Sequence, residues 1–202
     1  MLSSLPILHI IHSVVINFVL PWGNFIIYMY RPDGTMGGPI NKDRIDEPSE
    51  RLWKEFLDGD DTLRSKKLKF IPRIVVGPWM IKKIVGTNPA LIGQKIPTSY
   101  YGYRRSESLS SSPGKRRDKN YLEITFDVTK GGSMANSISN SVVGKAESIS
   151  IDMAFLIEGK TEAELPEQVL GLCRVHRLSM KEAMTWDQWK HNLKRNKGTL
   201  ND

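Results

Sequence analysis

The first thirty residues of the chain contain no aspartate, glutamate, lysine or arginine. A run of about 20 apolar residues would be long enough to span a bilayer. Pro21 and Gly23 interrupt this run, however, and it lacks the basic start and small-residue cleavage site of a secretory signal. The β-branched residues 14–20, a turn at 21–24 and the aromatic residues 25–30 instead predict a buried β-hairpin, with a membrane anchor as the alternative.

The rest of the chain alternates between short apolar segments and turns. Leu52, Trp53, Phe56 and Leu57 have the spacing of one helical face, and Gly59 suits the position just after such a helix. By the same patterns, strands are predicted at 68–76, 94–103, 121–128, 148–158 and 172–177, and helices at 79–85, 133–143 and 166–171. This order predicts a single domain of the α+β class, with an antiparallel β-sheet and a few short amphipathic helices.

Two prolines shape the details of this prediction. Pro72 has no backbone N–H, so we expect the strand 68–76 to be broken there, at a sheet edge or a bulge. Thr161–Glu164 matches a capping box, but Pro166 would fall inside the helix that this box would start. We therefore expect the helix to begin near Pro166.

Catalytic motifs are absent from the sequence. It contains no phosphate-binding loop, dinucleotide fingerprint or Gly-x-Ser-x-Gly elbow. Cys173 is the one cysteine, which excludes an internal disulfide framework and a cysteine-rich zinc site. His176 lies three residues later, so on a strand the two side chains point to opposite faces and cannot pair as nucleophile and base. We expect no enzyme activity, no cofactor and no metal site, and a cytoplasmic domain.

The net charge of +7 arises from one continuous block. Residues 62–106 contain ten basic residues and no acidic one, whereas the rest of the chain holds 19 basic and 22 acidic residues. If this block folds onto one face, it creates a positive field that attracts phosphate groups. The candidate lipid- or anion-binding residues are Lys66, Lys67, Lys69, Arg73, Trp79, Lys82 and Lys83.

Three partners suit such a surface to different degrees. An anionic membrane lipid is the expected one, and an acidic protein domain is the alternative. The sequence disfavours nucleic acid, because it has no recognition motif and no aromatic stacking platform of known spacing. Trp79 beside Lys82 and Lys83 suits a membrane interface. We nevertheless expect Trp79 to take a core position, while keeping it among the candidates.

Residues 104–119 separate two predicted strands and are rich in serine, glycine, lysine and arginine. Such a composition cannot bury apolar area, so we expect a mobile insertion. Ser112 precedes a proline and lies close to Lys115, Arg116 and Arg117. A phosphate would add about −1.5 to −2 charges, so these four residues form a candidate regulatory site that weakens binding when modified.

Several segments together resemble a known domain. They are Asp58–Asp61, LKFIPRIVVGPWMIKKIVGTNPALIGQKI at 68–96, NYLEITFDV at 120–128 and IDMAFLIEGKTEAELPEQVLGLCRVHRL at 151–178. In this order they are similar to the C-terminal domain of Enhanced Disease Resistance 2, a domain that plant and protist proteins share. The resemblance covers residues 14–178 and leaves an atypical or incomplete N-terminus at 1–13 and a basic tail at 179–202.

The resemblance implies a regulatory, lipid-associated role at the periphery of membranes. In the plant namesake, the domain follows a pleckstrin-homology domain and a START-like lipid-binding domain, and the protein restrains defence-linked cell death. Neither of these upstream domains is found in this sequence. The family supplies no catalytic residue that would transfer to a position of this chain.

Overall fold

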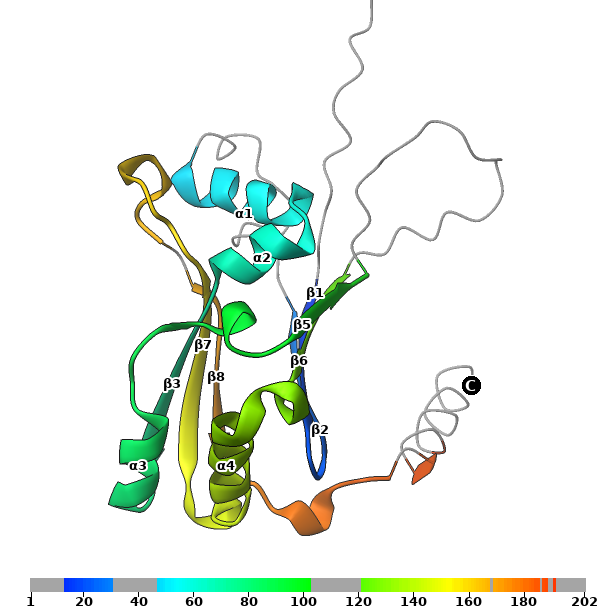
Figure 1. The fold of residues 1–202 in the computed structure, drawn as a ribbon. Helices are drawn as coiled ribbons and strands as arrows, with labels where there is room; N and C mark the ends of the chain where they lie inside the picture. Colours follow the sequence, from blue (N-terminus) through cyan, green and yellow to red (C-terminus); the bar gives the residue numbers. More distant parts are fainter. Residues whose placement is uncertain are drawn as a thin grey trace, which may run out of the picture.

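Two four-stranded β-sheets form the centre of the computed structural model, which describes residues 13–30, 47–102, 121–167, 169–185, 187–188 and 191 (Figure 1). The first sheet has the order β2 (Gly23–Tyr30), β1 (Ser13–Leu20), β6 (Tyr121–Asp127) and β5 (Thr98–Tyr101). The second has the order β4 (Ala90–Leu91), β3 (Leu68–Val76), β7 (Ser150–Ile157) and β8 (Val169–His176).

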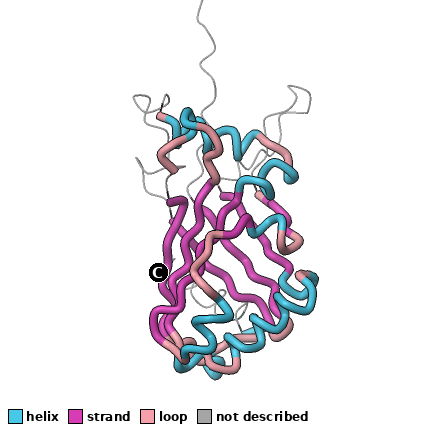
Figure 2. The backbone as a smooth tube through the Cα atoms, turned by 60° about the vertical axis from the view of Figure 1, so that its left-hand side comes forward, coloured by secondary structure: helices cyan, strands magenta, loops and turns pink. Residues whose placement is uncertain are grey.

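Helices gather at both ends of the strands (Figures 1 and 2). The helices α1 (Pro48–Asp58) and α2 (Asp61–Lys67) lie at one end, and α3 (Trp79–Val85) and α4 (Gly132–Val143) lie at the other. Short 3-10 turns complete the described part: η2 (Ile92–Gln94), η3 (Val128–Lys130), η4 (Ala146–Ser148), η5 (Glu162–Glu164) and η6 (Met180–Glu182).

The predicted α+β class and single domain are confirmed, and so is the hairpin of β1 and β2. The strands form two sheets rather than one, however, and β1 pairs with β6 in parallel. Every other strand pair is antiparallel. Because β2 occupies only one edge of β1, the other edge is left for a strand from much later in the chain. Among the described residues, no helix is long and apolar enough to span a membrane.

The core lies between the facing sheets. Alternate side chains of β1 and β6 point inward and are almost completely buried. On the facing strands, Leu68 of β3 and Phe155 of β7 are completely buried, whereas Phe70 and Ile151 are partly buried. The aromatic ring of Phe18 lies at the centre, with its centroid 5.1 Å from Phe126, 6.0 Å from Phe70 and 6.4 Å from Phe155. These contacts join the two sheets into one hydrophobic core.

The helix α1 closes one end of this core. Leu52, Trp53, Phe56 and Leu57 are all buried, as their spacing predicted. The backbone N–H of Gly59 donates to Glu55 at the end of the helix. The next helix is capped by the side chain of Asp60, which accepts a hydrogen bond from the backbone N–H of Leu63 at 2.7 Å.

The prediction about Pro72 was right about the sheet edge and wrong about the break. Within the described part of the chain, Pro72 lies where β3 has no partner on its β4 side, but pairing of β3 with β7 continues through it, and the irregularity lies later, between Ile74 and Val76. The prediction about Pro166 was wrong. No helix forms at 166–171, because β8 begins at Val169. The capping box at Thr161 is present, but it caps only the single turn η5. The insertion 104–119 and residues 1–12 lie outside the described residues.

Candidate anion-binding surface

Lys67 is the last residue of α2 and is nearly buried. Its ammonium Nζ lies 2.8 Å from Oε2 of Glu55 and 2.9 Å from Oε1 of Glu164. Desolvation by burial lowers the pKa of Lys67, but hydrogen bonds to the two glutamates and their charges outweigh it and raise the pKa above its ordinary value. Because its positive charge is balanced by two carboxylates, Lys67 is not available to bind a lipid headgroup.

Lys69, on β3, is also enclosed by carboxylates. Its Nζ lies 2.6 Å from Oε1 of Glu167 and also pairs with Glu158, and its side chain is 16% exposed. Glu167 is positioned in turn by the backbone N–H of Gly159, which donates to the same oxygen at 2.9 Å. The prediction that Lys67 and Lys69 bind a lipid or anion is therefore wrong, because both form ion pairs within the fold.

Lys66 and Arg73 are both exposed but lie on different elements, and only Arg73 is close in the chain to the part of β3 that packs against α3. Lys66 is on α2, at the opposite end of the strands from α3 (Figure 1). Arg73 is on the outward side of β3, opposite Asp152 in the register with β7. The basic block thus does not fold onto one face.

The α3 helix presents an apolar outer face. The exposed fractions are 72% for Trp79, 55% for Met80 and 41% for Ile84. The opposite side of this seven-residue helix is filled by Ile81 and Val85, which pack in a small cluster with Ile74 and Ile149. The expected core position of Trp79 is therefore wrong, because one stripe of so short a helix fills the available space.

Two lysines flank this apolar face. Lys82 and Lys83 are both exposed, and Lys82 Nζ donates one hydrogen bond to the carbonyl of Val75 at 3.1 Å. We use the name α3 surface for Val76, Trp79, Met80, Lys82, Lys83 and Ile84.

Local backbone geometry holds this surface in place. Gly77 adopts φ +146°, and a Cβ there would lie 2.7 Å from Cγ2 of Ile149. Gly86 ends the helix with φ +67°, a conformation that favours glycine. The chain therefore turns sharply on both sides of α3 and fixes its outer face toward solvent.

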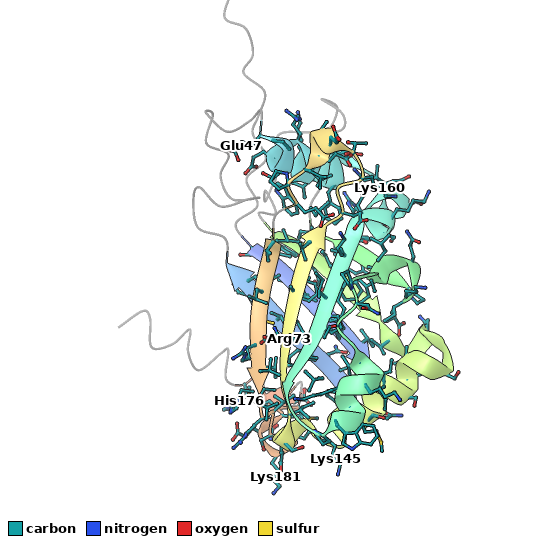
Figure 3. All side chains as sticks on the ribbon, turned by 90° about the vertical axis from the view of Figure 1, so that its left-hand side faces the viewer. Glu47, Arg73, Lys145, Lys160, His176 and Lys181 are labelled. Atoms are coloured by element: carbon teal, nitrogen blue, oxygen red, sulfur yellow. The ribbon has the colours of Figure 1, made fainter. Side chains whose placement is uncertain are left out.

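Further cations lie at the same end of the molecule but outside the basic block. Lys145 follows α4, and Lys181 is in η6; both are exposed, and Figure 3 places both at the α3 end of the strands. Val142 of α4 packs on the α3 cluster, which explains why Lys145 is brought near. No local pattern in the sequence distinguishes these two lysines. The exposure of Met80 and Ile84 could have been predicted, because residues 79–85 carry a second apolar stripe beside the one that is buried.

A cavity of about 340 Å³ opens at this end, lined by residues 143–148 and Met180. Two of the backbone amides that line it are bonded within the loop: the N–H of Ser148 donates to the carbonyl of Lys145, and the N–H of Lys145 donates to that of Val142.

Cys173 and His176 lie on opposite faces of β8, as their spacing predicted. Cys173 packs against the core, and burial raises the pKa of its thiol. His176 points outward, with Nδ1 2.5 Å from the hydroxyl of Ser150, which is itself 1% exposed and so unable to reach a substrate. Among the described residues, no group of histidine, cysteine and acidic side chains has a metal-ligating arrangement. The regulatory candidates Ser112, Lys115, Arg116 and Arg117 lie outside the described residues.

The fold and the exposed α3 surface define a small α+β domain with an apolar, cationic end. The chain belongs to the family described as Protein ENHANCED DISEASE RESISTANCE 2, C-terminal, whose family model matches residues 8–179. The family is thus named for a protein of disease resistance. A curated relative from Arabidopsis thaliana, Protein ENHANCED DISEASE RESISTANCE 2-like, is 32% identical over 133 residues. These residues are 66% of this chain and 16% of the relative, so the chain spans only a small part of that protein's length. No solved structure matches the chain significantly.

Proposed function

We propose that this domain is a non-catalytic regulatory module that docks from the cytoplasm on anionic membranes through the α3 surface. The observation that carries the proposal is the exposure of Trp79, Met80 and Ile84 directly beside Lys82 and Lys83. Amphipathic and basic residues together are what the boundary between lipid headgroups and acyl chains favours.

The two kinds of side chain contribute comparable free energies. A lysine near an anionic surface contributes about 1 kcal/mol. An apolar side chain that leaves water completely contributes about 1.5–3 kcal/mol. Three partly inserted apolar side chains and two lysines would therefore give reversible docking. Neither the apolar nor the electrostatic contribution would be sufficient by itself. Lys145 and Lys181, at the same end, extend the positive field.

Co-sedimentation with vesicles tests this function. We expect binding to phosphatidylcholine vesicles that contain phosphatidylserine or phosphoinositide, and little binding to pure phosphatidylcholine. Lys83→Glu and Trp79→Ala should each reduce binding. The matched controls are Lys66→Glu, an exposed lysine at the opposite end, and Ile26→Ala, an exposed apolar residue of β2. Equal binding to neutral vesicles at physiological salt, or equal losses in the controls, would exclude docking through α3.

We also propose that phosphorylation of Ser112 weakens this docking. The support is the local sequence, in which Ser112 precedes Pro113 and lies close to Lys115, Arg116 and Arg117. Added negative charge there reduces the attraction of the whole domain to anionic lipid. Ser112→Asp should lower vesicle affinity without changing the melting temperature. If Ser112→Asp and deletion of 106–119 both leave the affinity unchanged, the segment is only a spacer.

A further inference from the structure

The second sheet has an outer face that no described helix crosses. Figure 3 looks onto this face, where β8, β7 and β3 lie side by side in front of the rest of the molecule. The face runs along the strands, whereas the α3 surface lies at one end of them (Figure 1). The two surfaces are therefore distinct and can be tested separately.

Apolar side chains occupy the middle of this outer face. Because Phe70 and Phe155 pack into the core and side chains alternate along a strand, Ile71 and Ala154 point outward. Leu172 of β8 is opposite Ala154 and is 66% exposed. We name the outer-face patch for the accessible apolar residues in this row and in the neighbouring one: Ile71, Ala154, Val169 and Leu172. Leu156, opposite Val169, is itself buried and is not part of the patch.

A row of charged residues borders the patch on the side toward α3. Asp152 lies between Arg73 and Arg174 in the strand register, and the two oxygens of its carboxylate accept hydrogen bonds from Arg174 at 2.6 and 2.9 Å. The Arg174 guanidinium, with a smaller effect of Arg73, holds the pKa of Asp152 below its ordinary value. The row keeps one uncompensated positive charge, and within the described residues the exposed Arg73 side chain makes no salt bridge.

On the opposite border of the patch, the charged side chains form ion pairs with one another. Lys69 is there, and its ammonium is enclosed by Glu158 and Glu167. These two carboxylates have side chains that are 24% and 19% exposed, and both are used in pairing with Lys69. The free charge on this face is thus positive and lies along one margin.

We propose that the outer-face patch binds an amphipathic helical segment of a protein partner that carries acidic residues along one margin. Its apolar side chains would cover Leu172 and Val169, which is 52% exposed, and its carboxylates would contact Arg73 and Arg174. The two arginines lie two strand spacings apart, or about 9.6 Å. A helix rises about 1.5 Å per residue, so carboxylates about seven positions apart would reach both guanidinium groups.

Two synthetic peptides provide the probes. The first is an amphipathic helix of leucine, alanine and glutamate, with glutamates about seven positions apart on one margin of the leucine stripe. The second has lysine in place of each glutamate. Binding to the full chain is measured by isothermal titration calorimetry, and the contact surface is mapped by amide chemical shifts.

We expect the glutamate peptide to bind and to shift amides of β3, β7 and β8, while the lysine peptide does not bind. Leu172→Ser and Arg73→Glu should each weaken binding by about tenfold. Arg73→Glu should in addition bind the lysine peptide better than the wild type does. Leu172 is exposed, so Leu172→Ser should keep the wild-type urea midpoint. Arg73→Glu places a carboxylate opposite Asp152 and should lower the midpoint slightly, which urea denaturation measures separately from binding. Ile26→Ser, a comparably exposed residue of the other sheet, and Lys66→Glu are the matched controls.

Several results would overturn this assignment. Equal binding of both peptides, shifts confined to α3, or unchanged affinity in Leu172→Ser would each exclude an acidic partner at this face. A wild-type dimer in sedimentation that Leu172→Ser dissociates would show that a second copy covers the patch instead. Loss of vesicle binding in Leu172→Ser would show that the face contacts lipid.

Discussion

The ammonium group of Lys67 lies 2.9 Å from the carboxylate of Glu164, although the two residues are 97 positions apart in the chain. The same ammonium contacts Glu55 of α1, so one side chain joins α1, α2 and the turn η5. Glu164 also accepts hydrogen bonds from the backbone N–H groups of Lys160 and Thr161. This arrangement fixes the connection between β7 and β8 against the helices at that end.

Replacing Lys67 with methionine should destabilise the domain. The substitution leaves two carboxylates without their shared cation, and we expect a loss of about 2 kcal/mol in the free energy of unfolding, because both glutamates keep partial contact with water. Urea denaturation measures this change. The matched control Lys66→Met, at the exposed neighbouring position, should stay within about 0.5 kcal/mol of the wild type. Equal stability of the two variants would contradict the structural role of Lys67.

The acid stability of the domain should depend on Glu164. Hydrogen bonds from the backbone N–H of Lys160 and from Lys67 hold the pKa of Glu164 below its ordinary value of 4.5. A carboxyl group with a lower pKa in the folded state stabilises the fold above its unfolded pKa, and this stabilisation disappears as the pH falls through the folded pKa. The free energy of unfolding should therefore decrease more steeply below pH 4.5 in the wild type than in Glu164→Gln. Parallel curves from urea titrations at several pH values would be inconsistent with this mechanism.

Substitution of Gly93 by alanine should be costly because the backbone of α2 comes very close. A Cβ at this position would lie 2.6 Å from Cα of Ser65 and 2.9 Å from its carbonyl oxygen. We expect a destabilisation of about 2 kcal/mol, measured by urea denaturation. Gly144→Ala is the control, since Gly144 has helical φ and ψ of −62° and −10° and its nearest atom is at 3.3 Å. Equal destabilisation by both substitutions would show that the short distance between Gly93 and Ser65 does not determine the cost of adding a Cβ.

Trp79 should report membrane docking directly. Its side chain is 72% exposed, so its emission in solution should be that of a hydrated indole. On addition of anionic vesicles we expect a blue shift, because the indole leaves water for the headgroup boundary. The chain has five tryptophans, so the signal is assigned by difference with Trp79→Phe. A blue shift of equal size in Trp79→Phe would place another tryptophan at the membrane.

Local features of the chain were predicted well from the sequence. The turn at Pro21 and Gly23 specifies a two-stranded hairpin, and Pro78 and Gly86 bracket α3 at the predicted bounds. Both depend on backbone conformations that proline and glycine impose within a few residues. The buried face of α1 was predictable for the same reason, since its spacing is local.

Pairings between distant residues were not predictable in this way. Nothing near Lys67 or Lys69 indicates that Glu164 and Glu167 will neutralise them, so both lysines were counted as surface charges. The parallel pairing of β1 with β6 likewise depends on where the chain returns after the second sheet. Trp79 is exposed because Ile81 and Val85 already fill the space beneath α3, which depends on the neighbouring elements.

The short pairing of β4 with β3, which involves only two residues of each strand, has a consequence for aggregation. Only Lys69 and Phe70 of β3 pair with β4, so among the described residues the rest of that edge has no strand partner. An open edge is a template on which another chain can add a strand. Here Pro72 supplies no N–H, and Lys82 already donates to the carbonyl of Val75. Substituting Pro72 by valine would restore a donor to this edge and should make the protein more prone to amyloid-like growth.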